Sequence, residues 1–265
     1  FPTRRSSDLY IQTWHGTPLK KLGLDIETVK MPDHETESYK LEVIQEANRW
    51  DYLISPNAYS TRVFRQAFHY GGEILEVGYP RNDLLVCENK DKIAFSVRNQ
   101  LGLSVNQKII LYAPTWRDDE SIRKGAYRFT NHLPVEQLLA IDSSVVILTR
   151  LHYLIAESFD ISAFGSRVID VSSYPDINQL YLIADLLITD YSSVMFDFAL
   201  TKKPMLFFMY DKEKYQNSTR GFYFDPTAIL PGKIVTDTDS LVTSVKNVLF
   251  SKTEQEQRLY VQFFR

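Results

Sequence analysis

The chain has 265 residues, of which 44% are apolar and 24% charged, so at roughly 150 residues per domain it predicts one large or two smaller folded domains and excludes a wholly disordered chain. The net charge of -3 excludes a strongly basic surface along the whole molecule, and we expect no nucleic-acid partner. Cys87 is the single cysteine, which excludes a disulfide framework and a cysteine-rich zinc site and fits a reducing cytoplasm.

The two ends of the sequence are unusual. The chain begins with Phe1 rather than Met and ends inside what reads as a continuing segment, so we expect a piece of a longer protein. The first residues, 1–9, match the peptide encoded by a common short-read sequencing adapter read in one frame. We interpret them as non-native and leave them out of the fold argument; the alternative is a natural polar arm.

From Tyr10 onward, short apolar or β-branched runs alternate with helical patterns. In chain order the sequence predicts a strand at 51–55, a helix through 61–68 with its cap near 55–57, a strand at 74–77 and a polar helix at 90–101. Further strands are predicted at 108–112, 144–148, 168–171, 186–189, 204–208 and 233–235, with helical patterns between most of them. This alternation indicates an α/β protein with parallel sheets and a domain boundary near Gly102 to Gln107.

Polar side chains follow several of the predicted strands. The strand predicted at 108–112 is followed by Ala113, Pro114, Thr115, Trp116 and Arg117. The strand at 144–148 is followed by Thr149, Arg150, Leu151 and His152, and the strand at 186–189 is followed by Asp190 to Ser193. Ligands of open parallel sheets bind at the carboxyl ends of the strands. Ser192 and Ser193 also precede a helix predicted at 194–200, whose free amides suit a phosphate; the alternative is that both serines only cap this helix. Asp190 would repel a phosphate, so we expect it to orient the turn.

Two residues of the first half are candidates for chemistry. His15 follows an apolar stretch and precedes Gly16, and a histidine is the natural general base near neutral pH. Arg81 follows the turn 78–80, and a guanidinium can hold a phosphate through two bonds. The alternative for His15 is a purely structural role, and the alternative for Arg81 is an ion pair with a nearby carboxylate. We interpret the remaining histidines, His34, His69 and His132, as surface residues.

No Walker loop, GxGxxG fingerprint, HExxH motif or GxSxG motif occurs, which argues against P-loop ATPases, Rossmann dehydrogenases, zincins and α/β-hydrolases. Five motifs point elsewhere: residues 13–20 (TWHGTPLK), 78–83 (GYPRND), 113–117 (APTWR), 150–152 (RLH) and 189–193 (TDYSS) followed by 196–198 (FDF). In order and spacing they closely resemble the CDP-glycerol glycerophosphotransferase family of teichoic acid synthesis, and the resemblance covers Tyr10 to about Leu249.

The resemblance implies a fold and a reaction. The fold would be GT-B, with two Rossmann-like domains that have parallel sheets and face each other across a cleft, the first domain being truncated at its N-terminus. The reaction would be transfer of glycerol phosphate from CDP-glycerol, or of ribitol phosphate from CDP-ribitol, to a lipid-linked polyol-phosphate or disaccharide acceptor, with release of CMP. It would take place at the cytoplasmic face of the bacterial membrane, as a peripheral association of the full-length parent, and would need no metal or other cofactor.

The resemblance also implies roles for individual residues. His15 would be the catalytic base, and His152 would help bind or polarise the pyrophosphate. The remaining donor contacts would come from Gly16, Thr17, Pro18, Leu19, Arg81, Pro114, Thr115, Arg150, Leu151, Ser192, Ser193 and Asp197.

Under this interpretation residues 10–104 form the C-terminal part of the first, acceptor-side domain, and residues 105–265 form the second, CDP-polyol-binding domain, truncated at its C-terminus. Two other functions stay open: a GT-B glycosyltransferase or epimerase that uses a sugar nucleotide, and a noncatalytic nucleotide-binding module. The last of these would be favoured by a buried His15. The motifs do not distinguish glycerol from ribitol donors, nor a primase from a polymerase, and they do not say whether this stretch of chain is active alone.

Overall fold

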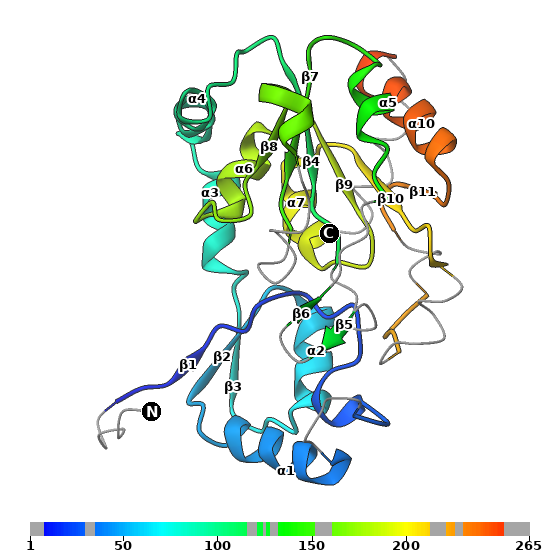
Figure 1. Ribbon diagram of the computed structural model, residues 1–265. Helices are drawn as coiled ribbons and strands as arrows, with labels where there is room; N and C mark the ends of the chain where they lie inside the picture. Colours follow the sequence, from blue (N-terminus) through cyan, green and yellow to red (C-terminus); the bar gives the residue numbers. More distant parts are fainter. Residues whose placement is uncertain are drawn as a thin grey trace. The chain divides into compact units, whose positions relative to one another are not determined.

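The computed structural model of the chain describes residues 8–29, 35–115, 121–123, 126–127, 132–151, 161–212, 221–225 and 230–251 (Figure 1). The chain divides into two compact units. The first unit contains residues 1–81 and 214–225, and the second contains residues 82–213 and 226–265. The predicted boundary at 102–107 therefore falls inside the second unit, and the division comes after Arg81.

The first unit is built on a three-stranded sheet in the order β1-β2-β3, in which both strand pairs are parallel. The other elements in the described part of this unit are two α-helices and a short 3-10 helix, η1. In chain order the elements are β1 (Ile11–Gln12), η1 (Gly23–Asp25), α1 (Thr36–Ala47), β2 (Tyr52–Ser55), α2 (Ala58–Ala67) and β3 (Glu73–Glu76), with η2 (Pro80–Asn82) running into the second unit. Asn57 caps α2, because its side chain accepts a hydrogen bond from the backbone amide of Ser60 at 2.8 Å.

An aromatic and aliphatic cluster forms the core of the first unit. Phe64 and Phe68 from the α2 region pack with Trp50, Leu53 and Tyr70, all of them buried. Trp50 and Phe68 meet edge to face, with ring centroids 5.3 Å apart. This cluster is the support on which the residues after β1 lie.

The second unit contains a six-stranded sheet in which every strand pair is parallel. Its strands are β4 (Lys108–Tyr112), β7 (Val145–Thr149), β8 (Val168–Asp170), β9 (Leu186–Thr189), β10 (Met205–Phe208) and β11 (Lys233–Val235). Their order in space is β8-β7-β4-β9-β10-β11, which is the order 3-2-1-4-5-6 of a doubly wound sheet. All six strands lie where the apolar runs predict them.

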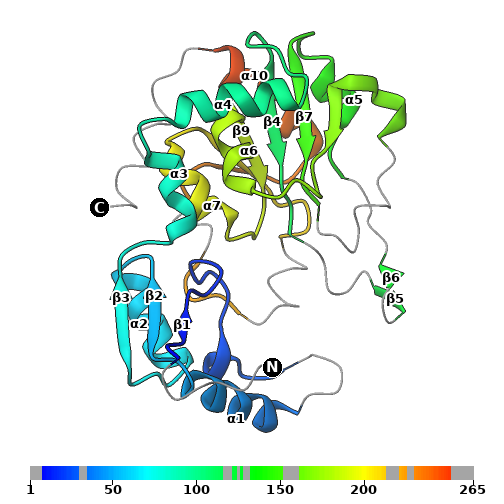
Figure 2. The same cartoon turned by 90° about the vertical axis from the view of Figure 1, so that its left-hand side faces the viewer.

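Helices cover both faces of this sheet (Figures 1 and 2). They are α3 (Asp83–Val86), α4 (Lys90–Gln100), α5 (Val135–Leu139), α6 (Ile177–Ile183), α7 (Val194–Phe198) and α10 (Thr238–Phe250), together with the 3-10 helices η5 (Ser162–Arg167) and η6 (Ala199–Thr201). α4 and α3 pack against α6, which explains why residues 82–104 belong to the second unit. A separate antiparallel pair, β5 (Ser121–Arg123) and β6 (Ala126–Tyr127), has no counterpart among the predicted elements.

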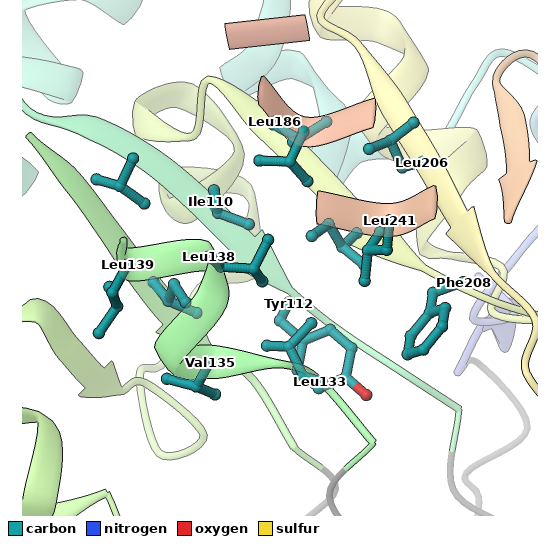
Figure 3. Close-up of a cluster of buried hydrophobic side chains, with 14 of the residues drawn as sticks. Ile110, Tyr112, Leu133, Val135, Leu138, Leu139, Leu186, Leu206, Phe208 and Leu241 are labelled. Carbon is teal, nitrogen blue, oxygen red and sulfur yellow. The ribbon is translucent and has the colours of Figure 1, made fainter. Parts of the chain in front are cut away.

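The side chains of successive residues in each central strand point to opposite faces of the sheet. Ile110 of β4 faces the cluster made with α5 and α10, in which Leu138 and Leu241 are fully buried (Figure 3). Ile109 and Leu111 are equally buried but do not belong to that cluster. A strand that is buried on both faces reads as a continuous apolar run, which is why the six strands could be located from the sequence.

Candidate functional site

The loop after β1 places an aromatic residue in a strained backbone conformation directly before His15. Trp14 has a φ of +53°, in the left-handed region that bulky residues rarely adopt. Its amide donates to the side-chain oxygen of Gln12 at 2.9 Å, and its ring lies 4.6 Å from that of Phe68 and 4.4 Å from that of His15. The core therefore holds Trp14, and Trp14 forms one side of the imidazole's surroundings.

His15 itself is exposed, whereas the four residues that follow it, Gly16 to Leu19, are buried. His15 is thus accessible from solvent while its backbone continues into a buried segment. The loss of solvent on the sides that face the protein lowers the pKa of His15, and the positive charge of Arg81 lowers it further. A lowered pKa keeps the imidazole neutral at physiological pH, which is the state that a general base needs.

Arg81 belongs to the same unit and follows the turn after β3. Its guanidinium lies over the ring of Tyr79, 4.3 Å from the ring centroid, and Tyr79 is buried. Gly78 has a φ of +83°, and its amide donates to the carbonyl of Ser55, so the turn that the sequence predicts at 78–80 is tied to β2. Stacking on a buried ring restrains the guanidinium close enough to His15 to act on its pKa.

Removing the Arg81 charge is therefore expected to raise the pKa of His15. An Arg81→Gln variant should shift the NMR titration of the His15 imidazole to higher pH, because the charged imidazole no longer meets a like charge. Arg49→Gln is the matched control, since this exposed arginine pairs with Glu46 of α1. A His15 titration that moves equally in both variants, or in neither, would contradict the role of Arg81.

In the second unit the predicted site residues of two loops meet where the strand order reverses. β4 and β9 are neighbours in the sheet, and the chain continues from β4 towards β7 and from β9 towards β10, on opposite sides. The amide of Thr115 donates to a carboxylate oxygen of Asp190 at 2.8 Å, and the hydroxyl of Thr189 donates to the carbonyl of Ala113 at 2.7 Å. Pro114 and Thr115 therefore lie beside the loop that carries Ser192 and Ser193, at the position where doubly wound sheets bind ligands.

Asp190 ties these two loops together. It is 2% exposed, and the carboxylate oxygen that accepts from Thr115 also accepts from the amide of Tyr191 at 2.6 Å. As expected, this carboxylate orients the turn.

Replacing Asp190 by alanine is expected to destabilise the protein by about 3 kcal/mol, because buried amides lose a charged acceptor. The melting temperature should fall by roughly 6–12 °C. Asp142→Ala is the matched control: Asp142 accepts from the amide of Ser144 in the same way, but it is exposed and precedes β7. Equal melting temperatures for the two variants would show that burial at Asp190 adds nothing.

Ser192 and Ser193 lead into α7, which spans only five residues and is shorter than the predicted 194–200. The amide of Val194 donates to the hydroxyl of Ser192 at a long 3.4 Å, and Ser193 makes no side-chain capping bond. Asp197 on α7 is 8% exposed and accepts a hydrogen bond from the side-chain amide of Asn82 at 2.7 Å. Asp197 is thus bonded to Asn82, the first residue of the second unit, and a direct role of Asp197 towards a ligand stays a prediction.

Arg150 and Leu151 follow β7, next to β4 in the sheet. The amide of Arg150 donates to the carbonyl of Tyr112, and one guanidinium nitrogen donates to the carbonyls of Val171 and Tyr174. Partial burial lowers the pKa of Arg150 from its ordinary value. Leu151 is buried, and its amide donates to the hydroxyl of Ser172 at 3.0 Å. Arg150 therefore braces the loop between β8 and α6 with part of its guanidinium.

The remaining expectations concern four histidines. His152, the second catalytic candidate, and His34 lie outside the described residues. His69 is exposed, as expected, with a φ of +48°. His132 differs from the expectation of a surface residue, because it is half-buried and stacks on Tyr210 with ring centroids 3.9 Å apart. Its neighbours in the sequence carry no sign of this contact, which depends on the end of β10.

The described parts of the chain contain neither a candidate metal cluster nor a candidate membrane-spanning helix. Within them, no group of three or more His, Cys, Asp or Glu side chains is placed to hold a metal ion. No described helix combines the length and the apolar character that a membrane span requires.

Comparison with known proteins decides which family carries these motifs. A family model described as CDP-Glycerol:Poly(glycerophosphate) glycerophosphotransferase matches residues 2–265. The chain belongs to this family. It is 47% identical over 244 residues to a teichoic acid poly(glycerol phosphate) polymerase of Bacillus subtilis (strain 168), covering 92% of this chain and 33% of the polymerase. It is 49% identical over 242 residues to a teichoic acid glycerol-phosphate transferase of Staphylococcus aureus (strain NCTC 8325 / PS 47), covering 90% of this chain and 62% of the transferase.

A solved structure of the wall teichoic acid polymerase TagF superposes with a TM-score of 0.88 at 46% identity, covering 98% of this chain and 63% of that one. The α/β architecture with parallel sheets is therefore that of a glycerophosphotransferase of this family. The chain spans between a third and two thirds of the length of these relatives.

Proposed function

We propose that the whole protein transfers glycerol phosphate from CDP-glycerol to a hydroxyl of a lipid-linked acceptor or of a growing poly(glycerol phosphate) chain, in teichoic acid or related cell-surface polymer synthesis. The observation that carries the proposal is the accessible imidazole of His15, whose pKa is lowered, in a chain of the glycerophosphotransferase family. A buried His15 would favour the noncatalytic alternative, and His15 is exposed.

The proposed chemistry is a displacement at phosphorus. The acceptor hydroxyl gives its proton to the imidazole of His15 while its oxygen attacks the β-phosphorus of the donor. The bond between that phosphorus and the bridging oxygen breaks, and its electron pair leaves with CMP. The imidazolium then releases the proton to solvent.

The growing negative charge needs fixed hydrogen-bond donors. We assign this role to Arg81 of the first unit and to Arg150, Thr115 and Ser192 of the second, and by resemblance to His152. The contacts that hold the guanidinium groups of Arg81 and Arg150 support the assignment, because donors that are already held need not reorganise during the reaction.

The finer parts of this interpretation belong to the same proposal. We assign the second unit to binding of the CDP-polyol and the first to the acceptor, as in a GT-B fold with two Rossmann-like domains. The acceptor would be lipid-linked, and the whole protein would work at the cytoplasmic membrane face as a peripheral protein. The strand order of the second unit and the residues gathered beyond β4 and β9 support the donor assignment.

The test is transfer of label by the full-length protein. Radiolabelled CDP-glycerol and a lipid-linked glycerol phosphate acceptor should give labelled lipid product and one CMP per transfer. Unlabelled CDP-ribitol as a competitor separates the two polyol donors, and acceptors of increasing length separate a primase from a polymerase. Binding of a UDP-sugar without binding of CDP-glycerol would favour the sugar-nucleotide alternative, and donor binding without transfer would favour the noncatalytic one.

A further inference from the structure

A short segment between β10 and β11 packs within the first unit, beside the residues that follow His15. We call residues 221–225 the strap. The amide of Lys21 donates to the carbonyl of Gly221 at 3.0 Å, and the amide of Tyr223 donates to the carbonyl of Leu19 at 3.1 Å. These bonds form an antiparallel bridge between Lys20 and Phe222. Gly221 suits its place, because its φ of +82° is one that other residues rarely adopt.

The side chain of Tyr223 adds a second set of bonds. Its hydroxyl donates to a carboxylate oxygen of Asp25 at 2.6 Å and accepts from the amide of Leu22 at 3.1 Å. The other oxygen of Asp25 accepts from the side-chain amide of Gln66 on α2 at 2.8 Å. Burial and the bond to Asp25 raise the pKa of Tyr223, so the phenol stays neutral and keeps its proton for this bond.

A second tyrosine holds the same segment through a separate bond. The hydroxyl of Tyr59 on α2 donates to the carbonyl of Pro18 at 2.8 Å, and its ring lies 5.9 Å from that of Phe224 of the strap. The η1 turn also packs closely against the end of α2, because a Cβ at Gly23 would clash with the carbonyl of Ala67. The backbone from Pro18 to Asp25 is thus held by α2 and by the strap, and His15, which is exposed, precedes this segment by three residues.

We propose that Tyr223 is a positioning residue for His15, which it restrains through the strap's bonds to Leu19 and Leu22 and through Asp25. This inference rests on the proposed function of His15 as the base. A base must lie within hydrogen-bond reach of the hydroxyl that it deprotonates, and a displacement of about 1 Å far from the chemistry can cost 10²-fold in rate. A segment anchored at Pro18, Leu19 and Leu22 limits such displacement.

The test compares two tyrosines that both donate to a carboxylate in the first unit. In the full-length protein, Tyr223→Phe is expected to lower kcat about tenfold while KM for CDP-glycerol changes less than about twofold, because alignment is lost and donor contacts are kept. Tyr10→Phe is the matched control: the Tyr10 hydroxyl donates to Glu46 at 2.9 Å. The control should keep the wild-type kcat even where it loses as much thermal stability. Equal kcat in the two variants would overturn the proposal.

A second variant tests the positioning role if Tyr223→Phe fails to fold, and a second measurement tests it without an activity assay. Gln66→Ala removes the bond from exposed Gln66 to Asp25 and should lower kcat about two- to threefold in the same direction. NMR of the His15 imidazole in the 265-residue chain, assigned with a His15→Gln variant, should show a shifted titration or a broadened signal in Tyr223→Phe but not in Tyr10→Phe.

The two proposals fail in different ways. A wild-type protein without transfer activity would reject the proposed function, and the imidazole signal would still test the strap. A wild-type protein that transfers glycerol phosphate, with an unchanged imidazole signal and unchanged kcat in Tyr223→Phe, would reject the positioning role alone.

Discussion

Replacing His15 by alanine in the full-length protein is expected to lower the turnover number by about 10²-fold or more, since general base catalysis contributes roughly 10²–10⁴-fold. Affinity for CDP-glycerol should stay nearly unchanged, because the proton moves only in the transition state. Single-turnover rates measure the first quantity, and calorimetry of donor binding measures the second.

His69→Asn is the control for this experiment. His69 belongs to the same unit, is exposed, and has a positive φ that asparagine tolerates better than other residues. The control should keep wild-type turnover. Near-normal turnover in His15→Ala would reject the assignment of the base and make His152 or a substrate-bound water the better candidate.

The second large effect is expected on donor binding at Arg150. Arg150→Ala should raise the Kd for CDP-glycerol about 10- to 100-fold, because a charge-assisted hydrogen bond to a phosphate acts in the ground state as well as in the transition state. Part of this loss would be indirect, since the guanidinium also donates to the carbonyls of Val171 and Tyr174. Calorimetry with CDP-glycerol measures the change.

Arg167→Ala is the control that separates loss of CDP-glycerol binding from loss of structural support. Arg167 also donates to backbone carbonyls of the second unit, those of Leu139 and Asp142, and no motif assigns it to the donor. It should lower thermal stability and leave the Kd unchanged. If Arg150→Ala also loses stability while its Kd stays at the wild-type value, Arg150 only braces the loop between β8 and α6.

The boundary between the two units could not be located from local sequence patterns. The polar helix predicted at 90–101 is present as α4, ending at Gln100, and its existence follows from local periodicity. Its membership in the second unit follows from its packing on α6, which lies far away in the sequence. The domain boundary predicted at 102–107, after this helix, therefore lies C-terminal to the observed division after Arg81.

The candidate site likewise contains residues that the sequence singles out and contacts that it does not predict. The residues of the five motifs could be singled out because each follows a strand with an unusual set of polar side chains. Trp14 could not be assigned a strained φ from its neighbours, and Tyr223 carries no local sign of its bonds to Asp25 and Leu22, which join residues about two hundred positions apart. Long-range hydrogen bonds leave no periodicity in a sequence.

By itself the sequence determined that this is an α/β protein with parallel strands, where eight of those strands lie, and which family the motifs resemble. Buried parallel strands are continuous apolar runs, and this signal is local. Only the tertiary structure decided the order β8-β7-β4-β9-β10-β11, the pairing of the loops after β4 and β9 through Asp190, and the strap behind His15. These features depend on which strands and loops become neighbours, and that choice is made by packing energy summed over the whole core rather than by any single segment.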